Sequence, residues 1–189
     1  MGTSGRRVVS EKIPSLDLPL ALVGLRGTGK TSLGHLLAER LSLPFLDLDL
    51  ELARRFGEQE ESTGALLQRV GLQRFRELES EALATCLAPA APFVLATGGG
   101  VIESPANRDL LGRAARCVWL LASPQVLMRR MAGDPSFRPP LTDLSPLAEC
   151  EELARRRAPL YEEVSELALE TGDRGLEFLA DEIFCHLSR

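Results

Sequence analysis

The sequence has 189 residues, of which 44% are hydrophobic and 26% are charged, and its formal net charge is −5. The length suits one globular domain with a single core, and the composition is typical of a folded protein. No apolar run approaches the ~20 residues that cross a bilayer, no secretory signal pattern opens the chain, and the acidic balance shows no nucleic-acid footprint. We therefore expect a cytoplasmic protein with neither a membrane nor a nucleic-acid partner.

The first elements alternate between an apolar run and a helical pattern. Residues 1–19 show little periodicity and indicate a flexible tail ahead of one domain over 20–189. The apolar run 20–23 ends at Gly24, as expected of a buried parallel strand. Leucines at helical spacing over 33–41 then indicate a helix with one apolar face.

The same alternation continues to the end of the chain. Further strands are expected at 45–46, 93–96, 117–121 and 167–169. A helix is expected to start over 51–56, and the clearest helical patterns are 75–87, 124–131, 146–164 and 176–187. Strands that alternate with helices call for a parallel sheet covered on both faces. We therefore predict an α/β fold, a three-layer α/β/α domain with a five-stranded parallel sheet.

A complete phosphate-binding motif lies between the first strand and the first helix. Residues 24–31 read Gly-Leu-Arg-Gly-Thr-Gly-Lys-Thr and match GxxxxGK[ST] in full. Glycines let backbone N–H groups surround phosphate oxygens, and the helix N-terminus adds partial positive charge. Lys30 is expected to reach the outer phosphates and the Thr31 hydroxyl to bind Mg²⁺. The candidate ATP-binding residues here are Gly27, Thr28, Gly29, Lys30, Thr31 and Ser32.

Two carboxylates follow the second strand. Asp47 and Asp49 lie just past its carboxyl end, the edge at which open α/β sheets bind ligands. Along an extended chain both would point to one side, so that one could steer hydrated Mg²⁺ and the other could meet a substrate hydroxyl. The alternative is a solvated turn that enters an acidic helix.

Later motifs complete a pattern that resembles the shikimate kinases. In the order found in that family, they are Phe75-Arg76 with Glu79, Gly98-Gly99-Gly100, Arg138-Pro139-Pro140-Leu141 and Arg157-Ala158-Pro159-Leu160-Tyr161. The resemblance covers roughly residues 20–187. It implies a nucleoside-monophosphate-kinase-like P-loop fold with strand order 2-3-1-4-5. It further implies transfer of phosphate from ATP, with Mg²⁺, to the 3-hydroxyl of shikimate, a small anionic polyol. We also expect a monomer.

The resemblance implies roles for single residues on the acceptor side. Asp47 would hold Mg²⁺ through water, and Asp49 would bind the acceptor hydroxyl and act as its base. Arg76 and Arg157 would bind the shikimate carboxylate, which guanidinium groups grip in bidentate geometry. The backbone of Gly98, Gly99 and Gly100 would close that side of the site. The substrate-binding region itself would span about 50–80.

On the nucleotide side the resemblance implies a mobile lid. This lid would span about 132–144, and its Arg138 would reach the ATP phosphates and act with Lys30 and Asp49 in catalysis. Arg130 and Arg174 would lie near the adenine.

The sequence also departs from the family pattern and leaves alternatives open. The segment between Gly57 and Gly71 is about three residues longer than the family pattern, and Leu72 stands where Glu commonly follows the glycine. One alternative is a ligand-sensing domain derived from a transcription regulator, although the chain lacks a helix-turn-helix and keeps the whole candidate set. The other is a different metabolite kinase of this fold, such as a gluconate kinase.

Overall fold

A five-stranded parallel sheet forms the centre of the protein. The computed structural model describes residue 14 and residues 16–59, 61–89, 91–132 and 144–188. The strands lie in the order β2-β3-β1-β4-β5, and all four neighbouring pairs are parallel. They are β1 (Leu20–Val23), β2 (Phe45–Asp47), β3 (Val94–Ala96), β4 (Arg116–Leu121) and β5 (Leu167–Glu170). The predicted class, sheet and strand order are therefore confirmed.

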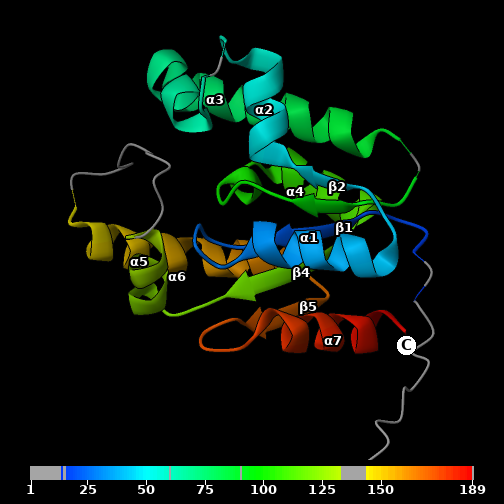
Figure 1. Cartoon of the computed structure of the whole chain (residues 1–189). Helices are drawn as coiled ribbons and strands as arrows, with labels where there is room; N and C mark the ends of the chain where they lie inside the picture. Colours follow the sequence, from blue (N-terminus) through cyan, green and yellow to red (C-terminus); the bar gives the residue numbers. More distant parts are fainter. Residues whose placement is uncertain (1–13, 15, 60, 90, 133–143, 189) are drawn as a thin grey trace, which may run out of the picture.

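Helices cover both faces of the sheet, as Figure 1 shows. They are α1 (Lys30–Leu41), α2 (Leu48–Phe56), α3 (Thr63–Leu87), α4 (Pro105–Ala114), α5 (Pro124–Met131), α6 (Pro146–Val164) and α7 (Leu176–Leu187), with a 3-10 turn η1 (Val101–Glu103). Among the described residues, no helix is both long and apolar enough to cross a membrane.

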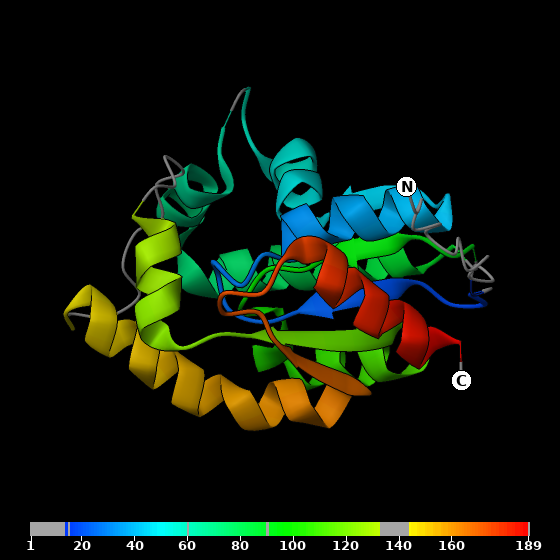
Figure 2. The same cartoon turned by 60° about the horizontal axis from the view of Figure 1, so that its bottom comes forward.

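The strands separate two apolar clusters. In β1, Leu20 and Leu22 pack on the side of α1 and α7, whereas Ala21 and Val23 pack on the side of α2, α3, α4 and α6. The arrangement of the helices about the sheet can be followed in a second view in Figure 2. All four β1 side chains are fully buried, because helices cover both faces of the sheet and neither face meets water. This explains why the strand reads as a continuous apolar run, and it confirms the three-layer architecture.

Helix α4 was not among the helices predicted from periodicity. It has ten residues and only a short apolar stretch, so its apolar face is weak in the sequence. Its start carries the usual local signals, because the Ser104 hydroxyl accepts a hydrogen bond from the Asn107 N–H and Pro105 occupies the first turn. Ser at the cap and Pro at the first helical position both favour a helix start.

Helix α3 is longer than the predicted 75–87 and is interrupted. It begins at Thr63, where the Ser62 hydroxyl accepts a hydrogen bond from the Ala65 N–H. Gly71 breaks it with φ of 78° and ψ of 160°, a left-handed conformation that glycine adopts without steric strain. The element is therefore two helical pieces joined at Gly71, of which only the second carried a clear pattern.

Parallel strands bring several loops to one edge of the sheet. Gly24 follows β1, Asp47 ends β2 next to Ala96 of β3, and the glycines at 98–100 follow that strand. Because these carboxyl ends share an edge, the loops that follow them meet there.

Two expectations concern residues that the structure does not describe. They are most of the N-terminal tail, residues 1–13, and the central part of the lid, residues 133–143, which includes Arg138.

Candidate functional site

The phosphate loop has the backbone that its glycines require. Gly24, Gly27 and Gly29 have φ angles of 142°, 80° and 92°. Residues other than glycine rarely adopt such angles. At Gly24 a Cβ atom would also collide with the carbonyl oxygen of Leu120. Lys30 begins α1 and is 9% exposed, and its Nζ donates hydrogen bonds to the carbonyls of Gly24 (2.9 Å) and Leu25 (2.8 Å).

The two carboxylates lie where β2 ends and a helix begins, with Asp47 as the last residue of β2 and Asp49 in the first turn of α2. α2 begins at Leu48, so the expectation that an extended chain aligns Asp47 with Asp49 was wrong. Asp47 is the N-cap, and its Oδ1 accepts hydrogen bonds from the N–H groups of Asp49 (3.0 Å) and Leu50 (3.4 Å). Its Oδ2 accepts a hydrogen bond from Thr31 Oγ1 at 2.9 Å. The backbone of Asp47 is still extended (φ −110°, ψ 118°), and its short side chain reaches the following amides, which favours the start of a helix directly after it.

A cavity of about 510 Å³ lies between the phosphate loop and α2, and we call it the phosphate-loop cavity. Predicted residues that line it are Gly27, Gly29, Lys30, Thr31, Ser32, Asp47, Asp49 and Gly99. Thr31 and Asp47 present a hydroxyl and a carboxylate to this space, and such oxygen donors suit a hard cation. Among the described residues, no group of three or more His, Cys, Asp or Glu side chains forms a closed metal cage.

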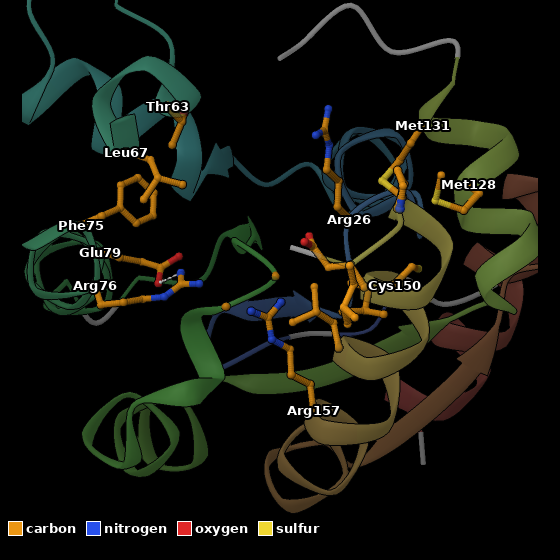
Figure 3. A pocket seen from close by; sticks show the side chains of 17 residues that line it. Arg26, Thr63, Leu67, Phe75, Arg76, Glu79, Met128, Met131, Cys150 and Arg157 are labelled. Carbon is orange, nitrogen blue, oxygen red and sulfur yellow. Dashed lines mark hydrogen bonds and ion pairs between the residues drawn. The ribbon is translucent and has the colours of Figure 1, made fainter. Parts of the chain in front are cut away.

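A second cavity, of about 410 Å³, lies between α3, α5 and α6, and we call it the arginine pocket (Figure 3). Its polar wall contains Arg76, Glu79, Arg157, Gly99 and Gly100, and Leu67, Phe75, Met128, Met131 and Leu153 contribute an apolar wall. The structure thus brings both predicted arginines and two of the three predicted glycines to one cavity.

Arg76 and Arg157 share one carboxylate. Arg157 is 4% exposed and donates from Nε and Nη2 to Glu103 Oε1, at 3.0 Å each. Arg76 Nη2 lies 3.4 Å from Glu103 Oε2, and its Nη1 donates to Glu79 Oε2 at 2.7 Å. Burial raises the pKa of the Glu103 carboxyl, but the charges of Arg157 and Arg76 outweigh it and the net shift is downward. Glu103 does not line the arginine pocket, so it holds the guanidinium groups from behind.

Gly98 and Gly100 are needed for space. A Cβ atom on Gly98 would lie 2.6 Å from Glu79 Oε1 and 3.1 Å from Asp49 Oδ1, and one on Gly100 would collide with the Arg76 guanidinium. Glu79 is 1% exposed. Burial raises the pKa of its carboxyl, and the nearby Asp49 charge adds to the rise, while Arg76 opposes it. Glycines at these positions therefore let the charged groups approach each other.

Tyr161 holds the glycine loop from the side of α6. Its hydroxyl donates a hydrogen bond to the Gly99 carbonyl at 2.6 Å, and its ring stacks on Trp119 with centroids 5.7 Å apart. Burial raises the pKa of this hydroxyl, so the group stays a hydrogen-bond donor at physiological pH.

The two arginines expected near the adenine line a third cavity of about 450 Å³, with Gly27, Thr28, Gly29 and Ser32. Arg130 joins two loops, since it donates to the Gly27 carbonyl (3.2 Å) and to the carbonyls of Thr171 (2.8 Å) and Gly172 (2.5 Å). Arg174 lies over the Phe178 ring, 4.3 Å from its centroid.

Sequence reasoning missed Glu103. It contacts Arg157 across 54 positions of sequence, and no local motif marks it. Only the fold reveals the contacts of Glu103 with Arg157 and Arg76. It places Glu103, which follows the triple glycine by three residues, next to two arginines that are distant in sequence.

Comparisons with known proteins agree with these observations. The family model of shikimate kinase matches residues 26–188. A shikimate kinase of Rhodopirellula baltica is 38% identical over 167 residues, which are 87% of each chain. One of Paracidovorax citrulli is 40% identical over 154 residues, 81% of this chain and 82% of the relative.

Comparison with solved structures also finds a shikimate kinase. The shikimate kinase of Acinetobacter baumannii in complex with shikimate superposes with a TM-score of 0.81 at 33% identity and covers 94% of both chains. A gluconokinase from Sinorhizobium meliloti has a TM-score of 0.62 at 19% identity over 92% of this chain and 93% of its own. That identity supports a common fold alone.

Proposed function

This chain belongs to the shikimate kinase family, and we propose that it transfers the γ-phosphoryl group of ATP to the 3-hydroxyl group of shikimate. The products are shikimate 3-phosphate and ADP. A Rhodopirellula baltica relative of this name and the Acinetobacter baumannii structure with shikimate support the choice of acceptor.

One observation carries the proposal: the arginine pocket adjoins the phosphate-loop cavity, with Gly99 in the wall of both. An acceptor whose carboxylate binds Arg76 and Arg157 extends from that end of the pocket toward Asp49. Guanidinium groups bind carboxylates in bidentate geometry. The hydroxyl-bearing ring of the acceptor then lies between the arginines and the phosphate loop.

Asp49 is our candidate for the base. It lines the phosphate-loop cavity, and its Oδ1 lies on the Gly98 side of that cavity, toward Glu79. A carboxylate there accepts the proton of the attacking hydroxyl as the oxygen–phosphorus bond forms. Lys30 neutralises charge on the transferring phosphates. We propose that Arg138, which lies outside the described part of the chain, neutralises charge there from the lid.

We propose Mg²⁺ as the cofactor, held by Thr31 Oγ1 and, through water, by Asp47. The two side-chain oxygens are 2.9 Å apart and open to the phosphate-loop cavity, which suits an ion that keeps several waters and binds substrate phosphates. When bound with ATP, the ion neutralises charge on the β- and γ-phosphates.

Asp47→Asn is expected to raise the Mg²⁺ concentration needed for half-maximal activity by about tenfold, as loss of one charged ligand weakens binding by roughly 1.4 kcal/mol. Asparagine still caps α2 through its Oδ1, so the helix start is kept. The measurement is the initial rate against Mg²⁺ at fixed ATP. An unchanged Mg²⁺ requirement contradicts the assignment, and Asp173→Asn, at an exposed carboxylate, is the matched control.

Glu103→Gln is expected to raise the KM for shikimate about tenfold with kcat within a factor of two or so of wild type, because a charge-assisted hydrogen bond contributes ~1.5–3 kcal/mol. Glutamine leaves an oxygen acceptor but removes the charge that fixes Arg157 and Arg76. The measurement is steady-state kinetics with shikimate varied at saturating ATP.

The control for this prediction is Glu163→Gln on the same helix as Arg157. Glu163 is an exposed carboxylate that pairs with Arg108, and its replacement is expected to leave both constants unchanged. A lower KM in Glu103→Gln contradicts the positioning role and makes Glu103 a competitor of the acceptor carboxylate.

The function itself is tested by coupled ADP release with shikimate, quinate, gluconate and nucleoside monophosphates as acceptors. We expect turnover with shikimate well above the others. Turnover with gluconate alone favours the gluconate-kinase alternative, and shikimate binding without ADP release favours the sensing-domain alternative. We also propose that the protein is a monomer, and size-exclusion chromatography tests it.

A further inference from the structure

Arg26 lies on a rigid part of the phosphate loop. It follows Leu25, whose carbonyl accepts hydrogen bonds from the Thr28 hydroxyl (2.8 Å) and the Thr28 N–H (3.4 Å). Gly24 and Gly27 on either side adopt left-handed φ angles that fix the direction of the loop. The position is open in GxxxxGK[ST], so the motif assigns it no role.

The Arg26 side chain lines two cavities at once. The arginine pocket and the phosphate-loop cavity share three lining residues, Arg26, Thr63 and Gly99. Of these three, Arg26 alone carries a charge. In Figure 3 its guanidinium extends into the space between Thr63 and Leu67 on one side and Met131 on the other.

The backbone at Arg26 is also where the two halves of the site touch. A Cβ atom on Gly99 would lie 3.4 Å from the Arg26 nitrogen and 3.4 Å from the Gly24 carbonyl oxygen. The glycine loop of the arginine pocket therefore rests on the phosphate loop at this residue. Any group that passes from ATP to an acceptor crosses the boundary beside Arg26.

The other described cations around these cavities hold different positions. Lys30 directs its ammonium to the carbonyls of Gly24 and Leu25, inside the loop. Arg76 and Arg157 lie on the carboxylates of Glu79 and Glu103. Arg26 lines both the arginine pocket and the phosphate-loop cavity, so its positive charge lies on the acceptor side of the phosphate loop.

We propose that the Arg26 guanidinium contacts the phosphoryl group during its transfer and is a catalytic residue. This inference rests on the proposed function. In the step, the acceptor oxygen forms a bond to the γ-phosphorus, the bond from that phosphorus to the ADP oxygen breaks, and the hydroxyl proton goes to Asp49. Negative charge is redistributed over the phosphoryl and ADP oxygens, and a guanidinium beside them stabilises the transition state more than the ground state.

Arg26→Met tests the proposal, because methionine retains a long unbranched stem without the charge. We expect kcat to fall about a hundredfold, the loss seen when one donor to a developing anion is removed, with both KM values within a few-fold of wild type. Arg26→Lys is expected to recover part of kcat, since an ammonium supplies charge but not the fork of donors. Affinity for ADP with aluminium fluoride and shikimate should fall, and affinity for ADP alone should not.

The matched control is Arg129→Met on α5. Arg129 is exposed, pairs with Asp173 and lines neither cavity, so its variant is expected to keep wild-type constants. A wild-type kcat in Arg26→Met overturns the proposal, and so does a rise in KM for shikimate at unchanged kcat.

A failure of the proposed function can be distinguished from a failure of the Arg26 proposal. If the wild-type protein does not phosphorylate shikimate, the acceptor assignment is wrong, and the variants are compared in slow ATP hydrolysis, where water attacks the same phosphorus. An equal hydrolysis rate in wild type and Arg26→Met then overturns the role of Arg26, and a reduced rate supports it.

Discussion

Lys30→Met is expected to lower kcat by on the order of a thousandfold and to weaken ATP binding, because one charged donor at the transferring phosphates is lost. The Lys30 side chain is 9% exposed and reaches the carbonyls of Gly24 and Leu25 at the centre of the loop. Its ammonium thus needs only a short movement to meet phosphate oxygens, and backbone N–H groups supply no net charge in its place. Coupled ADP release at saturating shikimate measures kcat, and titration with ATP measures binding.

The variant also loses two hydrogen bonds to the loop, so its fold has to be checked. We expect the thermal midpoint to fall by a few degrees, about the effect of ~1 kcal/mol for each lost bond, and the protein to remain folded at the assay temperature. A folded Lys30→Met protein with a kcat near wild type would contradict the assignment of this loop as the ATP phosphate site.

Asp49→Asn is expected to lower kcat by about 10²–10⁴-fold, the usual contribution of a general base. Asparagine is nearly the same size and still accepts a hydrogen bond from the hydroxyl, but it lacks the basicity to take the proton. The contact between the Thr63 hydroxyl and the Asp49 carbonyl, 3.0 Å long, involves the backbone and survives the change. The measurement is kcat and KM for shikimate, and we expect KM to change far less than kcat.

The control for Asp49→Asn is again Asp173→Asn, an exposed carboxylate paired with Arg129 and away from both cavities. Wild-type turnover in Asp49→Asn rules out Asp49 as the base and leaves it, at most, a group that orients the acceptor.

Local patterns were enough to predict the sheet and the phosphate loop. The run at 20–23 is apolar throughout because helices bury both faces of β1, and the glycines of 24–31 have the unusual φ angles that the loop needs. Each of these signals lies within a few residues of sequence, so no knowledge of tertiary contacts is required.

Contacts between distant segments set the remaining details. Glu103 meets Arg157 because η1 and α6 pack side by side, and the sequence around Glu103 is unremarkable. Asp47 lies at the edge of the sheet with the expected extended backbone, but Asp49 lies in a helix, because the helix starts one residue after Asp47 and the sequence does not show where the extended chain ends. Arg26 escaped notice because the motif allows any residue there.

The break at Gly71 divides the wall of the arginine pocket into two separately built parts. The piece of α3 before it carries Thr63 and Leu67, and the piece after it carries Arg76 and Glu79. Gly71, with φ of 78° and ψ of 160°, gives the chain a change of direction at this point that a continuous helix would not allow. A change in the length or direction of the first piece would therefore move Thr63 and Leu67, while Arg76, a cationic group that suits a carboxylate, keeps its place on the second piece.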